Sequence, residues 1–282
     1  SDSLLVYETN IAADTSHVVS DIVEGQFKYY RIIVEDIWGL ESESNIEIGD
    51  SHNWFNRTYG NPGGVGNSVQ QCSDDGYIVA GNMDGDGCLL KTDILGNVEW
   101  IQAIGGFDSD WFQSVHQTTD GGFISTGATN SYGNGGRAIW LVKSDALGAE
   151  EWSNTFFNGG GQGNCVEQTF DGGFILTGYA RISDSLGYEE LLLIKTDILG
   201  NEEWCRNYEQ DRFDVGHSVQ QTIDGGYIMA GYSSVGAWLI KTDSQGLVEW
   251  DRIISNSKYG FSVQQANDGG FVMSGKPNSD YG

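Results

Sequence analysis

Short runs of apolar residues, separated by polar turn residues, recur in a fixed order along most of this chain. In one instance SVQQ at residues 68–71 is followed by Asp75-Gly76 and then by YIVAG, an aromatic and aliphatic run. Runs of this length bounded by Gly and Asp predict β-strands. Asp-Gly between two of them predicts a tight hairpin, because Gly adopts positive φ without steric cost. No stretch has the helical period, so the pattern predicts an all-β protein.

A more apolar segment follows each hairpin after a loop of variable sequence. It reads CLLK, IWLVK, LLLIK and WLIK in successive units, and a strand that is apolar on both faces must be covered on both. A Lys-Thr-Asp or Lys-Ser-Asp turn then leads to a Glu-Trp pair, which begins a fourth strand. Each unit therefore predicts four short strands. The first strands of the units are residues 68–71, 114–117, 165–168, 218–221 and 262–265.

Tryptophan marks the period of these units, because Trp54, Trp100, Trp152, Trp204 and Trp250 are 46, 52, 52 and 46 residues apart by subtraction. Four strands about every 50 residues predict a β-propeller of four-stranded blades. A β-solenoid or a stack of sandwiches is the alternative. The sequence contains about five such units, and the last supplies only two strands. Trp54 occupies the position of the outer, fourth strand of a unit. Either the two ends complete one blade, or these blades belong to a larger ring of six to eight.

The turn before each tryptophan has the form T-D-x-x-G-x-x-x-W, as in TDILGNVEW. This motif resembles the tryptophan-docking repeat of quinoprotein-like propellers and, more loosely, the Asp-box turn of sialidase-type propellers. The resemblance implies blade geometry and no particular activity. No quinone cofactor is expected, because the adjacent cysteine pair of that enzyme family is absent. We expect the tryptophans to be packing anchors between blades, and the turn aspartates to be structural: Asp93, Asp145, Asp197 and Asp243.

A lysine recurs two residues before each of these aspartates and eight residues before a glutamate, at Lys91, Lys143, Lys195 and Lys241. A ring of cations could attract an anionic ligand. Recurrence in every unit favours a structural role, since a functional site breaks the symmetry of a repeat. We therefore predict an ion pair that stabilises the turn.

Residues 1–49 lie outside the repeat and predict four strands, which leaves residues 50–282 to the propeller. Within them, YYRIIVEDIWGLESESN resembles the last two strands of a fibronectin type III domain. The resemblance covers about half of such a domain, so it implies a partial module. It would make Tyr29 or Tyr30 the corner tyrosine, for which a plain core aromatic is an equally good interpretation.

The formal net charge is −26, from 40 acidic residues against 14 Lys and Arg. A phosphate backbone is bound by clustered Lys and Arg, so nucleic acid is not an expected partner. No run of about 18 apolar residues predicts a membrane span. The four cysteines have no metal-ligand spacing, which leaves buried thiols or one or two disulfides. They are Cys72, Cys88, Cys165 and Cys205.

Polar residues on the first strands offer one place for chemistry, because the innermost strands of a propeller face its channel. Gln70, His116, Glu167, Gln220 and Gln264 occupy the same position, and only His116 and Glu167 break the symmetry. A His and a carboxylate could act as a general base and its partner. A channel lined with polar groups and water is the simpler interpretation. His217, one residue before its strand, is interpreted as a blade-edge residue.

A second candidate is the segment from Asn82 through Asp84 to Asp86, which resembles the opening of a calcium loop with alternating oxygen ligands. Leu90 stands where the ninth-position ligand is expected, although Asp93 occupies the twelfth. Asp and Gly are also ordinary turn formers. Calcium is therefore a weak candidate, and no other cofactor is predicted.

We expect an extracellular or cell-surface binding or adhesion scaffold without catalytic activity, and a glycan or a surface protein as its partner. The fibronectin-like segment suggests this setting, because strings of such modules are similar to those of extracellular proteins. A polysaccharide hydrolase or lyase and a structural spacer are the alternatives. A binding module would expose aromatic residues from its variable loops, and the candidates are Tyr132, Trp111, Phe112 and Tyr188.

Overall fold

The computed structural model describes residues 64–133, 135–181, 188–210 and 213–277. The chain divides into two compact units, Ser1–Asn56 and Arg57–Gly282. The described residues all belong to the second unit. The fibronectin-like segment predicted at residues 1–49, and Trp54, lie outside them.

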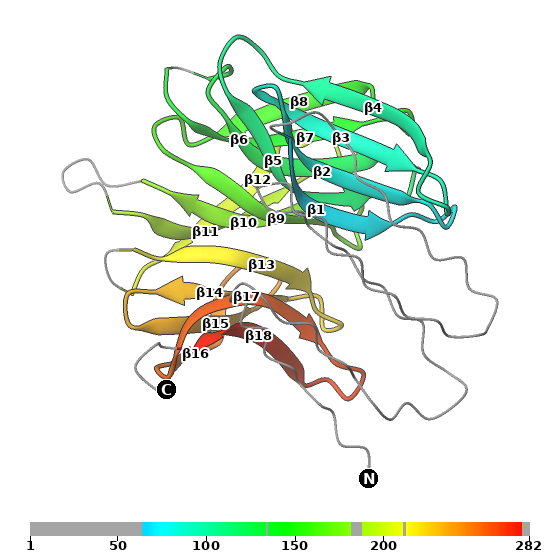
Figure 1. Ribbon diagram of the computed structural model, residues 1–282. Coiled ribbons are helices and arrows are strands. Elements are labelled where there is room, and N and C mark those ends of the chain that lie inside the picture. The colour runs from blue at the N-terminus through cyan, green and yellow to red at the C-terminus, as the bar shows by residue number, and fades with distance from the viewer. Residues whose placement is uncertain (1–63, 134, 182–187, 211–212, 278–282) are drawn as a thin grey trace, which may run out of the picture. The chain divides into compact units, whose positions relative to one another are not determined.

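The second unit consists of antiparallel sheets that follow one another along the chain (Figure 1). Four sheets have four strands, each paired with the next in sequence, and a two-stranded sheet ends the series. The first sheet contains β1 (Val65–Gln71), β2 (Tyr77–Met83), β3 (Asp86–Thr92) and β4 (Val98–Ile104), and the second contains β5 (Asp110–Gln117), β6 (Phe123–Thr129), β7 (Ala138–Ser144) and β8 (Glu150–Phe156). The third contains β9 (Gln162–Gln168), β10 (Phe174–Ala180), β11 (Glu190–Thr196) and β12 (Glu202–Tyr208), the fourth β13 (Val215–Gln221), β14 (Tyr227–Ser233), β15 (Gly236–Thr242) and β16 (Val248–Ile254), and the last β17 (Ser257–Gln265) and β18 (Phe271–Pro277).

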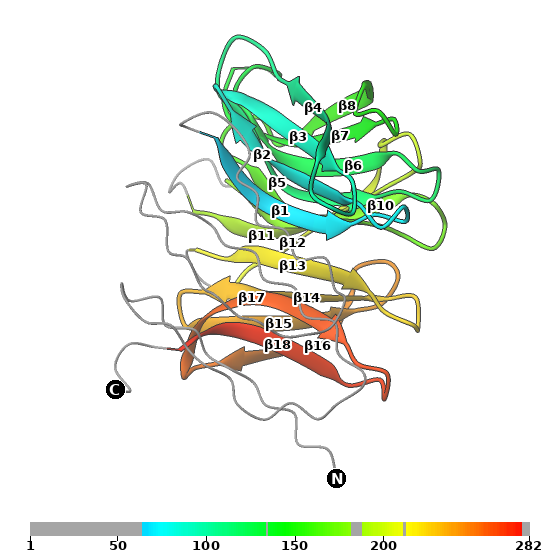
Figure 2. The same ribbon diagram turned by 45° about the vertical axis from the view of Figure 1, so that its right-hand side comes forward.

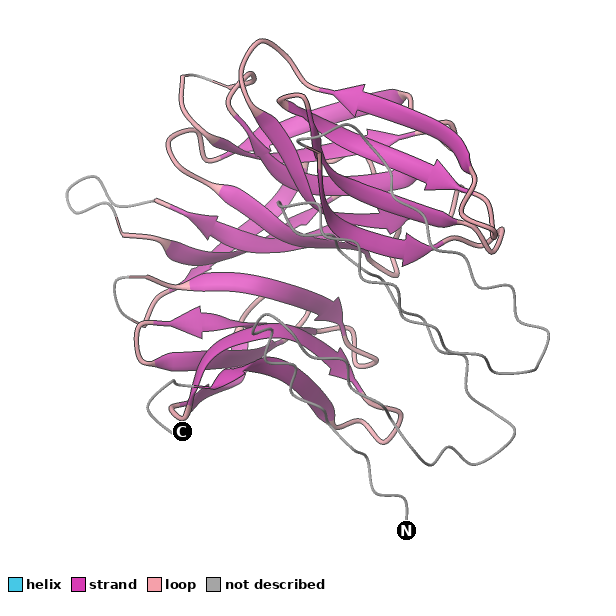
Figure 3. Ribbon diagram, in the orientation of Figure 1, coloured by secondary structure: helices cyan, strands magenta, loops and turns pink. Residues whose placement is uncertain are grey.

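The first strands of the sheets form the inner row of the unit. β1, β5, β9, β13 and β17 contact one another in this order, and the sheets extend outward from them with their faces together (Figure 2). The described residues form strands, turns and loops and no helix (Figure 3), hence none that could span a membrane. The fold is a β-propeller of four-stranded blades, as the repeat predicts.

The core lies between neighbouring blades. One cluster joins Ile124 and Leu141 of the second blade to Phe174 and Leu192 of the third, and all four are fully buried. The third strands β7, β11 and β15 are buried along their whole length. Because each lies in a sheet covered on both faces, most of their residues are apolar.

The first strands carry hydrogen bonds from blade to blade, which we call the clamp. Gln70 Oε1 accepts from the backbone N–H of Gln117 (2.6 Å), and Gln117 Oε1 accepts from the backbone N–H of Ser73 (2.7 Å). Ser68 Oγ accepts from the N–H of Val115 (3.3 Å). Each residue of the SVQQ phrase except its valine therefore bonds to a neighbouring blade. Corresponding bonds join Thr119 to Gln168, Phe170 to Gln221, Ile223 to Gln265, Gln265 to Gln220, Val166 to Ser114 and Val263 to Ser218.

The small-residue-plus-Gly ending of each second strand has a steric cause. A Cβ atom on Gly178 would lie 2.0 Å from the carbonyl oxygen of Gln162 on the neighbouring strand β9. The register of β9 against β10 shifts at this point, which brings the two backbones together. Only glycine fits such an approach.

Each repeated tryptophan contacts an aromatic ring of the following blade. The ring centroids of Trp152 and Phe174 are 5.8 Å apart, and a Cβ on Gly200, in the next blade's turn, would lie 2.4 Å from Cζ3 of Trp152. The indole thus lies over that turn and against the second strand. The other pairs are Trp100 with Phe123 (5.8 Å), Trp204 with Tyr227 (5.9 Å) and Trp250 with Phe271 (5.7 Å).

The repeated lysines are buried and each binds two carboxylates, one of which differs from the prediction. Lys91 Nζ lies 2.9 Å from Glu99, as expected, but its second partner at 2.7 Å is Asp74 of the first hairpin instead of Asp93. Asp93 accepts from the backbone N–H groups of Leu95 and Asn97 and so closes its own turn. The lysine therefore ties the turn of strands one and two to the fourth strand. The same pairs are Lys143 with Asp120 and Glu151, Lys195 with Asp171 and Glu203, and Lys241 with Asp224 and Glu249.

The four cysteines are free thiols. Burial raises the pKa of Cys72 to about 11 and that of Cys165 and Cys205 to about 12, and it also raises the pKa of Cys88. These side chains are protonated near neutral pH and behave as small apolar groups.

Candidate functional site

The two ends of the blades differ in character. The Asp-Gly hairpins and the Lys-Thr-Asp turns lie at one end of the strands, which we call the turn end. The variable loops between second and third strands, and the connections between blades, lie at the opposite end, the loop end. Since the turn end is uniform, a site that belongs to particular blades is expected at the loop end.

Four rings pack together at the loop end of the last two sheets. The centroids of Tyr232 on β14 and Tyr259 on β17 are 4.8 Å apart with the rings edge to face, and Phe261 stacks on Tyr259 at 5.8 Å. His217 on β13 lies 5.5 Å from Tyr232 and 5.7 Å from Phe261. We call His217, Tyr232, Tyr259 and Phe261 the aromatic cluster. Because strands from two blades hold these rings, the surface they form is rigid.

A cavity of about 350 Å³ opens beside the aromatic cluster. Phe213 on its wall is 48% exposed, and the Nζ of Lys258 lies 5.0 Å from the centroid of Tyr259. Aromatic residues share the wall with two serines and a lysine, so the cavity offers both stacking faces and hydrogen-bond donors. The cavity is lined by Phe213, Tyr232, Ser233, Ser234, Val235, Gly236, Lys258 and Tyr259.

Further aromatic residues extend this surface toward the third blade. Tyr188 meets Phe213 edge to face at 6.4 Å. Arg137 lies over the ring of Tyr179 at 5.6 Å and donates a hydrogen bond to its hydroxyl (2.9 Å). Burial raises the pKa of Tyr179 and of Tyr232, so both hydroxyls are neutral near pH 7 and can donate hydrogen bonds.

The aromatic residues predicted to be exposed have different fates. Phe112 is fully buried and stacks on Trp140 at 4.9 Å, so its prediction is wrong. The cause is that β5 begins at Asp110, earlier than the strand predicted at residues 114–117, so Phe112 belongs to a strand packed between blades and not to a variable loop. Trp111 is half-buried. Tyr132 is 40% exposed and donates to the carbonyl of Gly105, while Tyr188 lies on the surface described above.

Sequence reasoning missed most of the aromatic cluster and interpreted His217 as a plain blade-edge residue. One signal was available. The residue that follows the small-residue-plus-Gly ending is Tyr179 and Tyr232 in the third and fourth blades, but Asn82 and Ala128 in the first and second. An aromatic residue at one repeat position in two neighbouring blades indicates a shared surface there.

The two inner-strand residues that break the symmetry lie in different surroundings. Glu167 accepts a hydrogen bond from the backbone N–H of Gln221, which is the clamp bond that Gln70 and Gln220 make in their blades, and burial raises its pKa to about 7. Burial lowers the pKa of His116, and its Nδ1 has no hydrogen-bond partner among the described residues.

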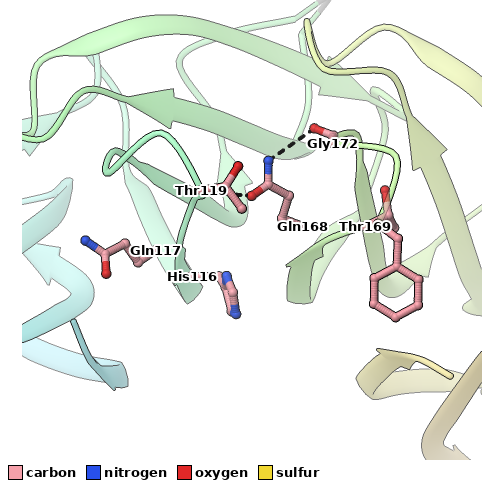
Figure 4. Close-up of a pocket in the computed structure, with 7 residues that line it drawn as sticks. His116, Gln117, Thr119, Gln168, Thr169 and Gly172 are labelled. Atoms are coloured by element: carbon pink, nitrogen blue, oxygen red, sulfur yellow. Dashed lines mark hydrogen bonds between the residues drawn. The ribbon is translucent and has the colours of Figure 1, made fainter. Parts of the chain in front are cut away.

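His116 also borders a cavity of about 390 Å³ at the turn end of the second and third blades. Figure 4 shows Gln168 there, bridging the backbone of Thr119 and the carbonyl of Gly172. The bond to Thr119 is a clamp bond, so part of the wall holds two blades together, whereas the bond to Gly172 lies within the first hairpin of the third blade. The lining is His116, Gln117, Thr119, Gln168, Thr169, Phe170 and Gly172.

The calcium candidate forms the hairpin between β2 and β3. Met83 pairs with Asp86, and the two residues between them, Asp84 and Gly85, have positive φ of 54° and 100°. A two-residue turn of this type favours Asp-Gly for conformational reasons. In the described part of the chain no three His, Cys, Asp or Glu side chains gather as metal ligands. Calcium at Asn82, Asp84 and Asp86 stays a prediction.

Comparison with known proteins supports the fold but identifies no family. No protein-family model and no curated protein matches the sequence. The Dos1 propeller matches with a TM-score of 0.52 and 14% identity, over 75% of this chain and 53% of its own, so the chain spans about half the length of that protein. A putative gluconolactonase (TM-score 0.45, 11% identity, 77% of this chain and 73% of its own) and YCF48 bound to D1 peptide (0.43, 13%, 74% and 60%) also match. At 14% identity the likeness to the Dos1 propeller shows the β-propeller fold alone.

Proposed function

We propose that this chain is a non-catalytic binding scaffold whose loop end binds carbohydrate at the aromatic cluster and its cavity. One observation carries the proposal: Tyr232 and Tyr259, from strands of two blades, line a cavity that also has serine and lysine donors. The turn end, in contrast, repeats the same hydrogen bonds from blade to blade.

Carbohydrate fits this chemistry better than other small ligands. The C–H face of a sugar ring packs on an aromatic side chain, and its hydroxyl groups bond to donors at the rim. Tyr232 and Phe213 provide the apolar faces, and Ser234 and Lys258 provide polar groups. A cavity of about 350 Å³ lies at the lower end of the range for small-molecule sites, about 300–1,000 Å³, which suits a chain end or a few sugar units.

An extracellular or cell-surface setting is part of this proposal. It is supported by the fibronectin-like sequence at residues 1–49 and by the strongly acidic composition, which suits a soluble protein in a saline medium. In that setting a polysaccharide or a glycosylated surface protein is an available ligand.

The geometry gives less support to a hydrolase or lyase. Such an enzyme needs paired acid and base groups at a concave site. Glu167 is the inner-strand carboxylate, and it already makes the bond that glutamine makes in two other blades. A structural spacer would not need a surface of clustered aromatic rings at one end of two blades.

A glycan array followed by calorimetric titration tests the proposal. We expect the chain to bind at least one glycan class, and Tyr232→Ala and Tyr259→Ala to weaken binding by about 1–2 kcal/mol, or roughly five- to thirtyfold, because each removes a stacking ring.

Phe107→Ala is a matched control. Phe107 lies on the connection between the first two blades, as Phe213 lies on that between the third and fourth, and its side chain is fully exposed. Binding should be unchanged in this variant. Equal losses in Phe107→Ala and Tyr232→Ala, or no binding to any glycan, would reject the assignment.

A further inference from the structure

The outer edge of β18 differs from the second strand of every complete blade. β2, β6, β10 and β14 each pair with a first strand on one side and a third strand on the other. Among the described residues β18 pairs with β17 alone. In the part of the chain that the structure describes, its other edge has no partner strand, and the backbone N–H and C=O groups of such an edge can pair with another strand.

Side chains that are buried in the other blades are exposed on β18. Val272 is 49% exposed, whereas the residue at the same position is completely buried in each complete blade. Those residues are Ile78, Ile124, Ile175 and Ile228. The sequence of β18 thus carries an apolar residue suited to a covered sheet at a position that nothing described covers.

Asp268 is the second difference. The turn aspartate of each complete blade binds the buried lysine of the third strand, as Asp224 binds Lys241 at 3.0 Å. Asp268 has the same turn geometry, since it accepts from the N–H of Gly270 at 2.9 Å just as Asp224 accepts from Gly226 at 3.0 Å. No lysine or arginine of the described residues forms an ion pair with Asp268. The carboxylate is therefore positioned for a cation that would arrive with a third strand.

We propose that β18 is an acceptor edge for an extended peptide strand of the pattern apolar, aliphatic, aliphatic, Lys, Ser or Thr. The register follows from the fourth blade, where Ile228 is opposite Lys241 and Met229 is opposite Ile240. The incoming lysine lies opposite Val272 and reaches Asp268. The preceding aliphatic residue lies opposite Met273.

The remaining features of the edge agree with this occupant. Pro277 at the end of β18 has no N–H, so pairing is confined to the segment from Phe271 to Lys276. Strand addition of this kind takes its affinity from main-chain hydrogen bonds and its specificity from alternate side chains. Here Asp268 selects for lysine, and Met273 selects for an apolar residue opposite it.

A second copy of this chain is a poorer occupant. Each copy carries a net charge of −26, which opposes association of copies. A short strand that carries a lysine supplies the cation without this repulsion.

The probe is a fluorescein-labelled peptide with the sequence of residues 236–243, GAWLIKTD, added to the full chain and followed by fluorescence anisotropy. We expect saturable binding, and binding weaker by about tenfold when the peptide carries Lys241→Glu. In the protein, Asp268→Asn should weaken binding about fivefold, the range of a partly exposed ion pair.

Asp224→Asn is the matched control. It removes the corresponding turn carboxylate of the fourth blade, which already pairs with Lys241, so peptide binding should be unchanged. Three results would overturn the proposal. They are no saturable binding, equal affinity for the lysine and glutamate peptides, and a dimer by light scattering whose mass the peptide does not alter, which would place a second copy on the edge. Circular dichroism of each variant establishes that it is folded.

Discussion

Trp152→Ala removes one of the repeated indoles between two complete blades. Trp152 is half-buried, lies 5.8 Å from the fully buried ring of Phe174 and covers the turn at Gly200. Truncation of a fully buried Trp costs about 3–5 kcal/mol, and the exposed part of the indole contributes little, so we expect a loss of about 2–3 kcal/mol. For a unit of this size each kcal/mol lowers the unfolding midpoint by about 2–4 °C.

The assay is urea and thermal unfolding followed by circular dichroism. Trp152→Phe keeps a ring against Phe174 and should cost about 1 kcal/mol. Phe170→Ala serves as the surface control, because Phe170 is 75% exposed and its truncation should cost less than about 0.5 kcal/mol. If Trp152→Ala costs no more than Phe170→Ala, the indole does not hold neighbouring blades together and the packing argument is wrong.

Two further predictions concern pH. Burial raises the pKa of Glu167 from 4.5 to about 7, so the folded state loses stability as pH rises from about 4.5 to 7. Glu167→Gln should therefore raise the free energy of unfolding by about 1–3 kcal/mol at pH 8 and leave it unchanged at pH 4. Urea titrations at both pH values measure this difference. The pKa of Asp224 is lowered to about 2, first by the Thr222 hydroxyl and, against the opposing effect of burial, also by Lys241. This stabilisation is complete above pH 3.8 and is lost as pH falls through 2. Because the carboxylate is 58% exposed, we expect Asp224→Asn to cost about 1 kcal/mol at pH 6 and almost nothing at pH 2. An equal cost at the two pH values would contradict the assignment.

Strands, hairpins and blade period were predictable because their causes are local and repeated. Asp120-Gly121 forms a hairpin turn through a left-handed glycine with φ of 87°. Asp93 closes the turn between β3 and β4 by accepting hydrogen bonds from residues two and four positions further on. The apolar sequence of β11 predicted a strand covered on both faces. Four or five copies of each signal made these interpretations secure without any knowledge of contacts between blades.

What the sequence could not predict depends on contacts between elements and on where individual strands begin. The partner of Lys91 comes from the preceding hairpin, because hairpin closure brings Asp74 closer than the neighbouring Asp93. Phe112 is buried because β5 extends back to Asp110, so a residue predicted in a variable loop lies in a strand that packs between blades. The aromatic cluster combines strands from two blades, so no local pattern contains it.

The clamp bonds have a consequence for how such a protein can diversify. In each of them a side-chain oxygen on one repeat accepts a hydrogen bond from the main chain of its neighbour, as Gln70 does from the backbone N–H of Gln117. The receiving position can therefore mutate without loss of the bond, and a duplicated or exchanged module would still fit beside its new neighbour. The residues of a binding surface can therefore change in evolution while the clamp bonds between blades are kept.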